Sequence, residues 1–190
     1  MNDLAPILER CRRGDELAWE ALVRQYQSRV YAVSLQYVRD SDEALDLAQD
    51  IFVRIYKRLE TFQGHETFLP WLMRLSRNAA IDHLRRRKAR PPRRDVPVED
   101  EPSLADTRPL PDVDWETQGR RQLVHTAMGK LTKTNREMIL LKEIQGLNLK
   151  EIAEILGIPV GTVKSRSNRA RLELAQAILA LDPSAGMSTS

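Results

Sequence analysis

The sequence predicts an all-α protein of two small helical domains joined by an extended, proline-rich acidic linker. Apolar residues recur at three- and four-residue spacing in both halves of the chain, as in amphipathic helices. Only 5% of the 190 residues are aromatic, and strand-like alternating runs are missing. Six of the ten prolines fall within residues 91–115, a stretch that cannot propagate a helix. It predicts a domain at 1–90, a linker at 91–117 and a domain at 118–180.

The N-terminal half is expected to form a helical bundle. Its helices are expected at 3–11, 15–38, 41–59 and 68–88, with a loop at 62–66. Ser41 is expected to cap the third helix. The inward-facing residues expected from helical spacing are Leu17, Ala21, Leu22 and Val30 in the second helix, Ala44, Leu47, Ala48, Ile51, Ile55 and Leu59 in the third, and Phe68, Trp71, Leu72, Leu75, Ala79 and Leu84 in the fourth.

The C-terminal half is expected to begin with helices at 117–130 and 133–145, followed by two helices joined by a tight turn. Asn148 can cap the first of this pair, with Glu151 in the capping-box position. Gly157 supplies the left-handed residue that ends it. The residues expected to pack the pair are Leu149, Ile152, Ala153, Leu156, Val163, Ala170 and Leu174. Residues 181–190 are expected to form a disordered tail.

The charges are unevenly distributed, although the net charge is only +3. Residues 74–94 carry nine Arg or Lys and one acid, whereas residues 95–116 carry eight Asp or Glu and one base. Such opposite blocks indicate different partners, or different places on one partner. No apolar run approaches the roughly 18–20 residues that span a bilayer, and the N-terminus lacks a signal-peptide pattern. We therefore expect a cytoplasmic protein, with Cys11 as a core thiol in a reducing compartment.

Signals for catalysis are weak. The three histidines, His65, His83 and His125, have no metal-ligand spacing. The eight glycines form no phosphate-binding loop. We expect no catalytic residue, no metal or other cofactor and no small-molecule substrate.

Three surface features remain as candidate sites. The first is a stripe of helical spacing on the third helix, formed by Asp46, Gln49, Asp50 and Val53. A solvated acidic face and a protein-docking face both fit this spacing. The second is the run on the fourth helix formed by Arg74, Arg77, Asn78, Arg85, Arg86, Arg87 and Lys88. Arginine forks suit phosphate, and Asn78 with Phe62 could cradle an unstacked base beside the loop that holds His65. A dipole-complementing helix end is the alternative.

The third feature is the basic face of the last helix. Its members are Thr162, Lys164, Ser165, Arg166, Asn168, Arg169 and Arg171. A helix of this charge, held by a short partner helix, suits the major groove of DNA. An ordinary helical hairpin with a solvated face is the alternative.

These residues resemble a known family. The segments EALDLAQDIF at 43–52, FLPWL at 68–72 and RNAAIDHLRR at 77–86 resemble the second region of extracytoplasmic-function (ECF) sigma factors. The segments EIA at 151–153, GIPVGTVKSR at 157–166 and RAR at 169–171 resemble their fourth region. The resemblance covers roughly residues 10–90 and 118–178. It implies an alternative sigma factor that binds core RNA polymerase, directs initiation at specific promoters and is held by an anti-sigma factor.

The resemblance also implies roles for the three surfaces. The acidic stripe matches the positions that dock on the clamp helices of the largest polymerase subunit, and the polymerase flap is a further expected contact. Phe62, its loop and the run on the fourth helix match the parts that capture melted minus-ten DNA. The last helix matches the reader of the minus-thirty-five element. Two departures are Ser167, where a large aliphatic residue is usual, and Leu45, where an acid is usual.

Two other interpretations are open. One is a stand-alone helix-turn-helix regulator, which would usually be a dimer, whereas we expect a free monomer. The other is a pure interaction protein whose DNA surface is vestigial. The promoter sequence, the inducing signal and the anti-sigma partner's identity do not follow from the sequence.

Overall fold

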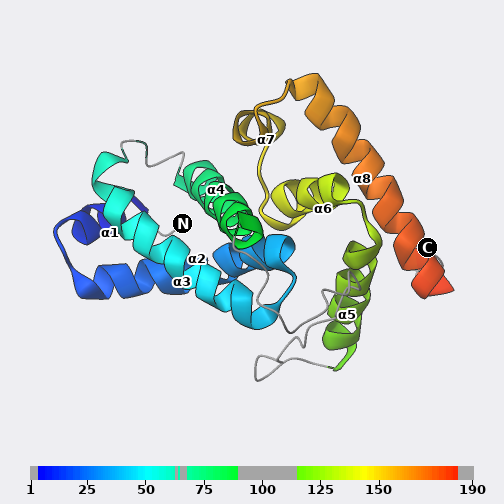
Figure 1. Ribbon diagram of the computed structural model, residues 1–190, viewed down its shortest axis with the longest axis horizontal. Helices are drawn as coiled ribbons and strands as arrows, with labels where there is room; N and C mark the ends of the chain where they lie inside the picture. Colours follow the sequence, from blue (N-terminus) through cyan, green and yellow to red (C-terminus); the bar gives the residue numbers. More distant parts are fainter. Residues whose placement is uncertain (1–3, 63, 65–67, 90–114, 184–190) are drawn as a thin grey trace. The chain divides into compact units, whose positions relative to one another are not determined.

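The computed structural model describes residues 4–62, 64, 68–89 and 115–183 and divides the chain into two compact units between residues 101 and 102 (Figure 1). Within the described residues every regular element is helical. The all-α prediction with two helical domains is therefore confirmed. Most of the predicted linker and the tail beyond residue 183 lie outside the described residues, as does His65.

The first unit is built around its long second helix. Its elements are α1 (Leu4–Arg12), α2 (Glu16–Val38), α3 (Ser41–Arg58), the 3-10 turn η1 (Leu59–Thr61) and α4 (Phe68–Ala89). Helix α2 packs against α1, α3 and α4, and α3 also packs against α4. The side chain of Asp15 caps α2 by accepting a hydrogen bond from the backbone N–H of Ala18.

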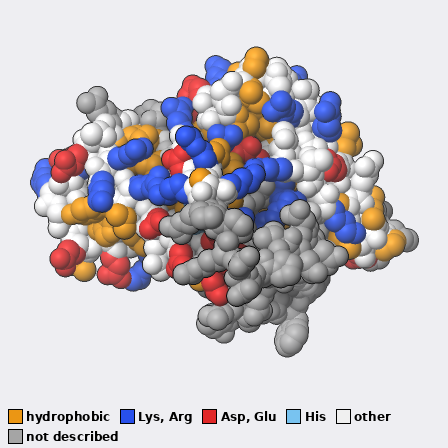
Figure 2. All heavy atoms as spheres, in the orientation of Figure 1, with side chains coloured by type: hydrophobic (Ala, Val, Ile, Leu, Met, Phe, Trp, Pro, Cys, Tyr) orange, Lys and Arg blue, Asp and Glu red, His pale blue; other side chains and the backbone are white. Residues whose placement is uncertain are grey.

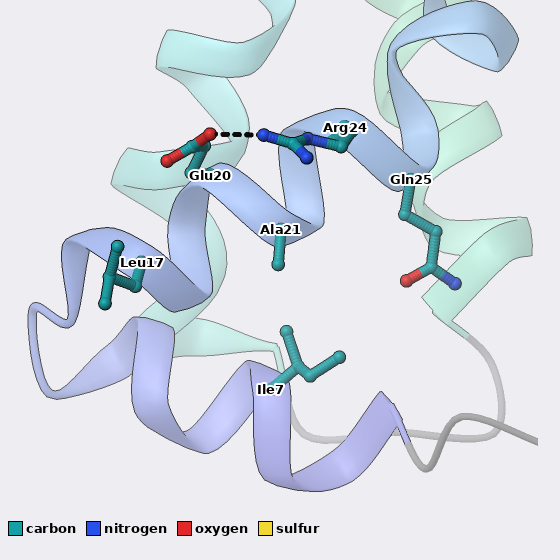
Figure 3. A pocket seen from close by; sticks show the side chains of 6 residues that line it. All are labelled: Ile7, Leu17, Glu20, Ala21, Arg24 and Gln25. Atoms are coloured by element: carbon teal, nitrogen blue, oxygen red, sulfur yellow. Dashed lines mark hydrogen bonds and ion pairs between the residues drawn. The ribbon is translucent and has the colours of Figure 1, made fainter.

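The prediction that Leu17 and Ala21 face inward on α2 is wrong. Leu17 is 72% exposed and Ala21 is also exposed. The buried stripe runs instead through Ala18, Leu22 and Tyr26, so Leu17 and Ala21 each stand one position, about 100° around the helix, away from it. Both line a shallow hollow between α1 and α2 (Figure 3).

The cap of α3 also differs from the prediction. Asp40, rather than Ser41, accepts the hydrogen bond from the N–H of Glu43 at 2.8 Å, and Ser41 is the first helical residue. The predicted apolar stripe of α3 is confirmed in full, since Ala44, Leu47, Ala48, Ile51, Ile55 and Leu59 are all buried. On α4, Phe68, Leu72, Leu75 and Ala79 are buried as predicted, while Trp71 and Leu84 are half-buried.

The second unit surrounds its last helix. Its elements are α5 (Trp115–Lys130), α6 (Lys133–Ile139), the π-helical turn η3 (Leu140–Ile144), α7 (Leu149–Leu156) and α8 (Val160–Leu181). Helix α8 packs against α5, α6 and α7. The single helix predicted at 133–145 thus changes to π geometry after Ile139. The first helix begins at Trp115, two residues before the predicted end of the linker.

Candidate nucleic-acid interface

The predicted acidic stripe lies on the exposed side of α3. Asp46, Gln49 and Asp50 are exposed, and Val53 is 52% exposed although it is apolar. Leu45, where the resemblance leads one to expect an acid, is also 49% exposed. The buried stripe of the same helix fixes this orientation, because residues three and four apart share a face. The four side chains can therefore meet a partner together.

Phe62 does not present its ring to solvent. It is buried, with its ring centroid 5.5 Å from that of Phe68 and 4.9 Å from that of Trp71. This cluster ties the end of η1 to the start of α4 by aromatic packing. The prediction that Phe62 cradles an unstacked base has no exposed ring to support it in this structure.

A residue that sequence reasoning missed holds the same segment from α1. The guanidinium of Arg12 donates hydrogen bonds to the backbone carbonyls of Leu59, at 3.3 Å, and Phe62. These carbonyls follow the end of α3, where backbone acceptors lack helical partners. The available signal was the unpaired carbonyls expected at any helix end. Nothing in the residue pattern indicates which distant cation reaches them.

The basic run on α4 is largely solvent-exposed. Arg74 and Asn78 are exposed and Arg77 is half-buried, and the later members Arg85, Arg86, Arg87 and Lys88 are all exposed. Lys and Arg side chains gather over this helix on the face drawn in Figure 2. Because Arg and Lys neutralise phosphates and release counterions, such a surface favours nucleic acid.

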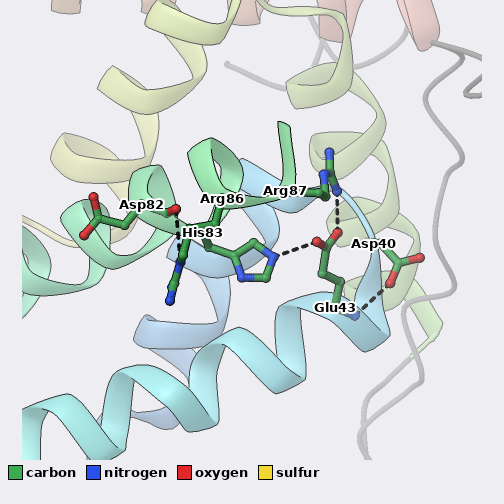
Figure 4. Close-up of polar contacts among 6 residues, drawn as sticks. All are labelled: Asp40, Glu43, Asp82, His83, Arg86 and Arg87. Carbon is green, nitrogen blue, oxygen red and sulfur yellow. Dashed lines mark hydrogen bonds and ion pairs between the residues drawn. The ribbon is translucent and has the colours of Figure 1, made fainter. Parts of the chain in front are cut away.

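One carboxylate from α3 reaches the end of this run. The Oε1 atom of Glu43 lies 2.7 Å from Nε2 of His83, and its Oε2 atom lies 2.7 Å from Nη1 of Arg87 (Figure 4). Farther along α3, Arg54 lies 3.8 Å from Asp82 of α4. One predicted cation of α4, Arg87, is therefore paired with an acid of α3, an arrangement that helical spacing alone did not reveal.

The paired helices of the second unit follow the predicted local chemistry. The side chain of Asn148 accepts from the N–H groups of Lys150 and Glu151, and the side chain of Glu151 accepts from the N–H of Asn148. This is the predicted capping box. Gly157 ends α7 with φ 66°, a left-handed conformation that glycine adopts without steric cost. Pro159 directly precedes α8.

The predicted reader residues line α8. Lys164, Ser165, Asn168, Arg169 and Arg171 are exposed, while Thr162 and Arg166 are half-buried. Three other residues of this helix, Val163, Ser167 and Ala170, are buried. Their spacing places them on one face. The helix is thus anchored on one side and presents polar and basic groups on the other.

Two further residues that sequence reasoning missed fix α8 and its neighbours. Arg136 is buried, and its guanidinium donates to the carbonyls of Met128 and Gly129 at 2.7 and 2.9 Å and to that of Leu131 at 2.9 Å. Glu173 of α8 accepts from the N–H of Thr132 at 2.9 Å and from the side chain of Asn135. Together they hold the end of α5 and the start of α6 against α8.

Other chemistry in the described residues is limited. Within them, no group of three or more His, Cys, Asp or Glu is arranged to hold a metal ion. Cys11 is buried, and this burial, followed by the negative charge of Asp15, raises the pKa of its thiol. A raised pKa reduces the thiolate fraction and hence reactivity. None of the described helices has the length and apolar content needed to cross a bilayer.

Each of the two units matches a model of a known protein family. Residues 22–90 match the family model of sigma-70 region 2, and residues 121–174 match that of sigma-70 region 4. The RNA polymerase sigma-H factor of Pseudomonas aeruginosa is 36% identical, over 90% of this chain and 92% of the relative. The ECF RNA polymerase sigma-E factor of Escherichia coli K12 is 34% identical, over 87% of this chain and 88% of the relative.

Two solved structures share the fold. One is CnrH in complex with the cytosolic domain of CnrY, with a TM-score of 0.65, 23% identity and coverage of 95% of this chain and 99% of the other. The other is the sigma factor RpoE bound to the anti-sigma factor NepR from Bartonella quintana, with a TM-score of 0.61, 22% identity and coverage of 86% and 97%. At these identities the likeness concerns the fold.

Proposed function

Because this chain belongs to the ECF group of RNA polymerase sigma factors, which direct promoter-specific transcription initiation, we propose a role for each of its three exposed surfaces. The observation that carries the proposal is that each unit combines a family-matched helical scaffold with an exposed basic helix, α4 in one and α8 in the other. Such a chain performs no chemistry itself. It binds core polymerase, locates a two-part promoter and traps melted DNA.

Polymerase docking is assigned to the stripe on α3. Asp46, Gln49, Asp50 and Val53 are exposed together, and the carboxylates suit a basic partner surface. Val53 adds apolar area that burial in an interface would stabilise. By resemblance, the partner surface is the clamp helices of the largest subunit, and the polymerase flap is a further contact. Polymerase operates in the cytoplasm, which is where we place this protein.

Capture of the melted minus-ten element is assigned to α4 and its preceding loop. Arg74, Arg77 and the cations from Arg85 to Lys88 supply phosphate contacts, and the exposed amide of Asn78 can hydrogen-bond an everted base. Phe62 contributes through the aromatic cluster that fixes the start of this segment. His65 belongs to the same loop and stays part of the proposal on resemblance alone.

Reading of the minus-thirty-five element is assigned to α8. Its anchored side fixes the helix, and its open side carries Lys164, Arg166 and Arg169. The remaining members of this surface are Thr162, Ser165, Asn168 and Arg171. Arginine and lysine make the commonest specific major-groove contacts, to guanine. The N-terminal half of a recognition helix is the part that usually reaches base edges.

An anti-sigma factor is the proposed regulator. The solved relatives with this fold, RpoE and CnrH, were each determined with a bound partner, which is named as an anti-sigma factor for RpoE. A protein that covers the basic helices or the acidic stripe would prevent promoter use without altering the fold.

Run-off transcription with core RNA polymerase on a pool of genomic fragments tests the proposal. Adding the protein should produce discrete new transcripts that share two upstream elements. Binding to core without new transcripts would favour a pure interaction protein. If core does not bind the protein, while the free protein protects duplex DNA from cleavage, a stand-alone helix-turn-helix regulator replaces the proposal.

A further inference from the structure

The carboxylate of Glu43 occupies a position between two cationic or protonatable groups at the end of α4. Its two oxygens lie 2.7 Å from Nε2 of His83 and 2.7 Å from Nη1 of Arg87. The side chain of Glu43 is only 23% exposed. The capping bond from the N–H of Glu43 to Asp40 holds the backbone from which this carboxylate projects (Figure 4). The contact is therefore built from two helices rather than from two free surface side chains.

A carboxylate in this position resembles a phosphate in what it offers to Arg87. One oxygen of Glu43, Oε2, accepts from the guanidinium as a phosphate oxygen would, and either anion offsets the charge of Arg87. The side chain of Arg87 is nevertheless 55% exposed. A nucleic-acid phosphate can therefore approach the same guanidinium from solvent and compete with Glu43.

We propose that Glu43 sets the nucleic-acid affinity of α4 by neutralising Arg87 in the free protein. Phosphate binding at Arg87 then has to displace the carboxylate. Arg87 therefore adds little affinity for unrelated nucleic acid. It adds affinity where other contacts already hold the strand. This inference rests on the proposed function, in which Arg87 contacts melted DNA. It makes Glu43, outside the predicted DNA-binding set, a determinant of specificity.

The competing role for Glu43 is to position Arg87 for DNA. The two roles predict opposite results for Glu43→Gln, which keeps the shape of the side chain and removes its charge. A neutralising carboxylate, once removed, leaves tighter binding. A positioning carboxylate, once removed, leaves weaker binding.

The experiment measures binding of the full-length protein to a fluorescent single-stranded oligonucleotide of mixed sequence by anisotropy. We expect Glu43→Gln to bind about threefold tighter at about 50 mM salt, because one more cation is open to phosphate. The slope of log affinity against log salt should steepen by about 0.7, the value for one single-strand phosphate contact. The advantage of the variant should therefore shrink about 2.6-fold between about 50 and 200 mM salt.

Two matched variants control for net charge and for the partner. Glu20→Gln makes the same charge change at another ion pair of the first unit, where Glu20 lies 2.6 Å from Arg24 on α2 (Figure 3). It should leave the affinity near that of the wild type. Adding Arg87→Gln to Glu43→Gln should cancel the gain. Circular dichroism and thermal unfolding establish that each variant is folded.

Four results would overturn the inference. If Glu43→Gln and Glu20→Gln have equal effects on affinity, the increase in affinity comes from net charge alone. If the increase persists when Arg87→Gln is added, it does not depend on Arg87. Weaker binding by Glu43→Gln would assign it the positioning role. If neither wild type nor Glu43→Gln binds the oligonucleotide, the inference fails with the assigned role of α4. Run-off transcription by the wild-type holoenzyme still judges the proposed function separately.

Discussion

The two basic helices of the chain differ in how acids accompany their cations. On α4, Arg87 shares the carboxylate of Glu43, and Asp82 of the same helix faces Arg54 of α3. These pairs cross between α3 and α4, so folding of the first unit brings them together. One cation of the surface proposed to hold melted DNA, Arg87, is thus paired with an acid before any nucleic acid arrives.

Among the described residues, the cations in the N-terminal half of α8 are not accompanied by acids in this way. Within the part of the chain that the structure describes, no hydrogen bond or ion pair engages the side chains of Lys164, Arg166 and Arg169. Glu143 lies 3.9 Å from Nε of Arg171, toward the C-terminal end of this set of residues. The helix proposed to contact duplex DNA therefore keeps Lys164, Arg166 and Arg169 available for that contact.

The contrast fits the two forms of DNA. A duplex offers phosphates and base edges at fixed spacing, so a rigid helix with open cations can match it directly. A single strand is flexible and its charge is the same in every sequence, so open cations would bind any exposed strand. A competing carboxylate lowers that background. Three further changes sharpen or break this comparison.

The largest effect is expected from Lys164→Ala combined with Arg169→Ala. Each removes an open cation of α8, and a good base contact contributes about 1–3 kcal/mol. We expect run-off transcription from the protein's own promoters to fall about 100-fold, since each 1.4 kcal/mol is a factor of ten. The charge-matched control is Arg13→Ala with Lys130→Ala, at two exposed positions outside both basic helices. Unchanged transcription in the first variant would remove α8 from promoter selection.

A smaller effect is expected from Ser167→Leu, which restores the large aliphatic residue usual in the family. Ser167 is 2% exposed on the packed side of α8, so a larger side chain overfills its site, at a cost of about 1–3 kcal/mol. The midpoint of urea unfolding, followed by circular dichroism, should fall accordingly. Ser167→Ala removes only a hydroxyl and adds no volume, so it should lower stability less than Ser167→Leu. An increase in stability for Ser167→Leu would mean that α8 is loosely packed, and that the small residue is a defect.

Local signals in the sequence were sufficient for much of this fold. The capping box of α7, the left-handed Gly157 and the buried stripe of α3 each depend on residues within one helix and its ends. Leu17 and Ala21 were assigned wrongly because α2 is apolar on several sides. Its neighbours, rather than its own periodicity, select the stripe through Ala18 and Leu22.

The types of residue in the candidate site could be predicted from the sequence, but the contacts between those residues could not. The basic runs and the acidic stripe follow from residue type and spacing. The contacts of Arg12 with Phe62, Arg136 with the end of α5, and Glu43 with Arg87 do not. The first and last of these join residues 44 to 50 positions apart, and many cations were equally available to each acceptor. Only the packed structure selects among them.

The smallest effect is expected from Arg171→Ala. Arg171 already donates to Oδ1 of Asn168 at 2.7 Å and lies 3.9 Å from Glu143. It also stands about two helical turns beyond Lys164. Part of its charge is therefore satisfied within the protein, and we expect holoenzyme binding to promoter duplex to weaken less than threefold. The salt slope should fall by under about 0.5, against about 0.9 for Lys164→Ala.

Titrations of the Arg171→Ala and Lys164→Ala holoenzymes against the same duplex at several salt concentrations make this test. If both variants lose equal affinity and equal slope, a neighbouring acid does not govern what an arginine contributes here. The contrast between α4 and α8 would then be one of position only. A clear difference would extend to α8 the rule proposed for Glu43 and Arg87, because a nearby carboxylate lowers the contribution of a cation to DNA binding within either helix.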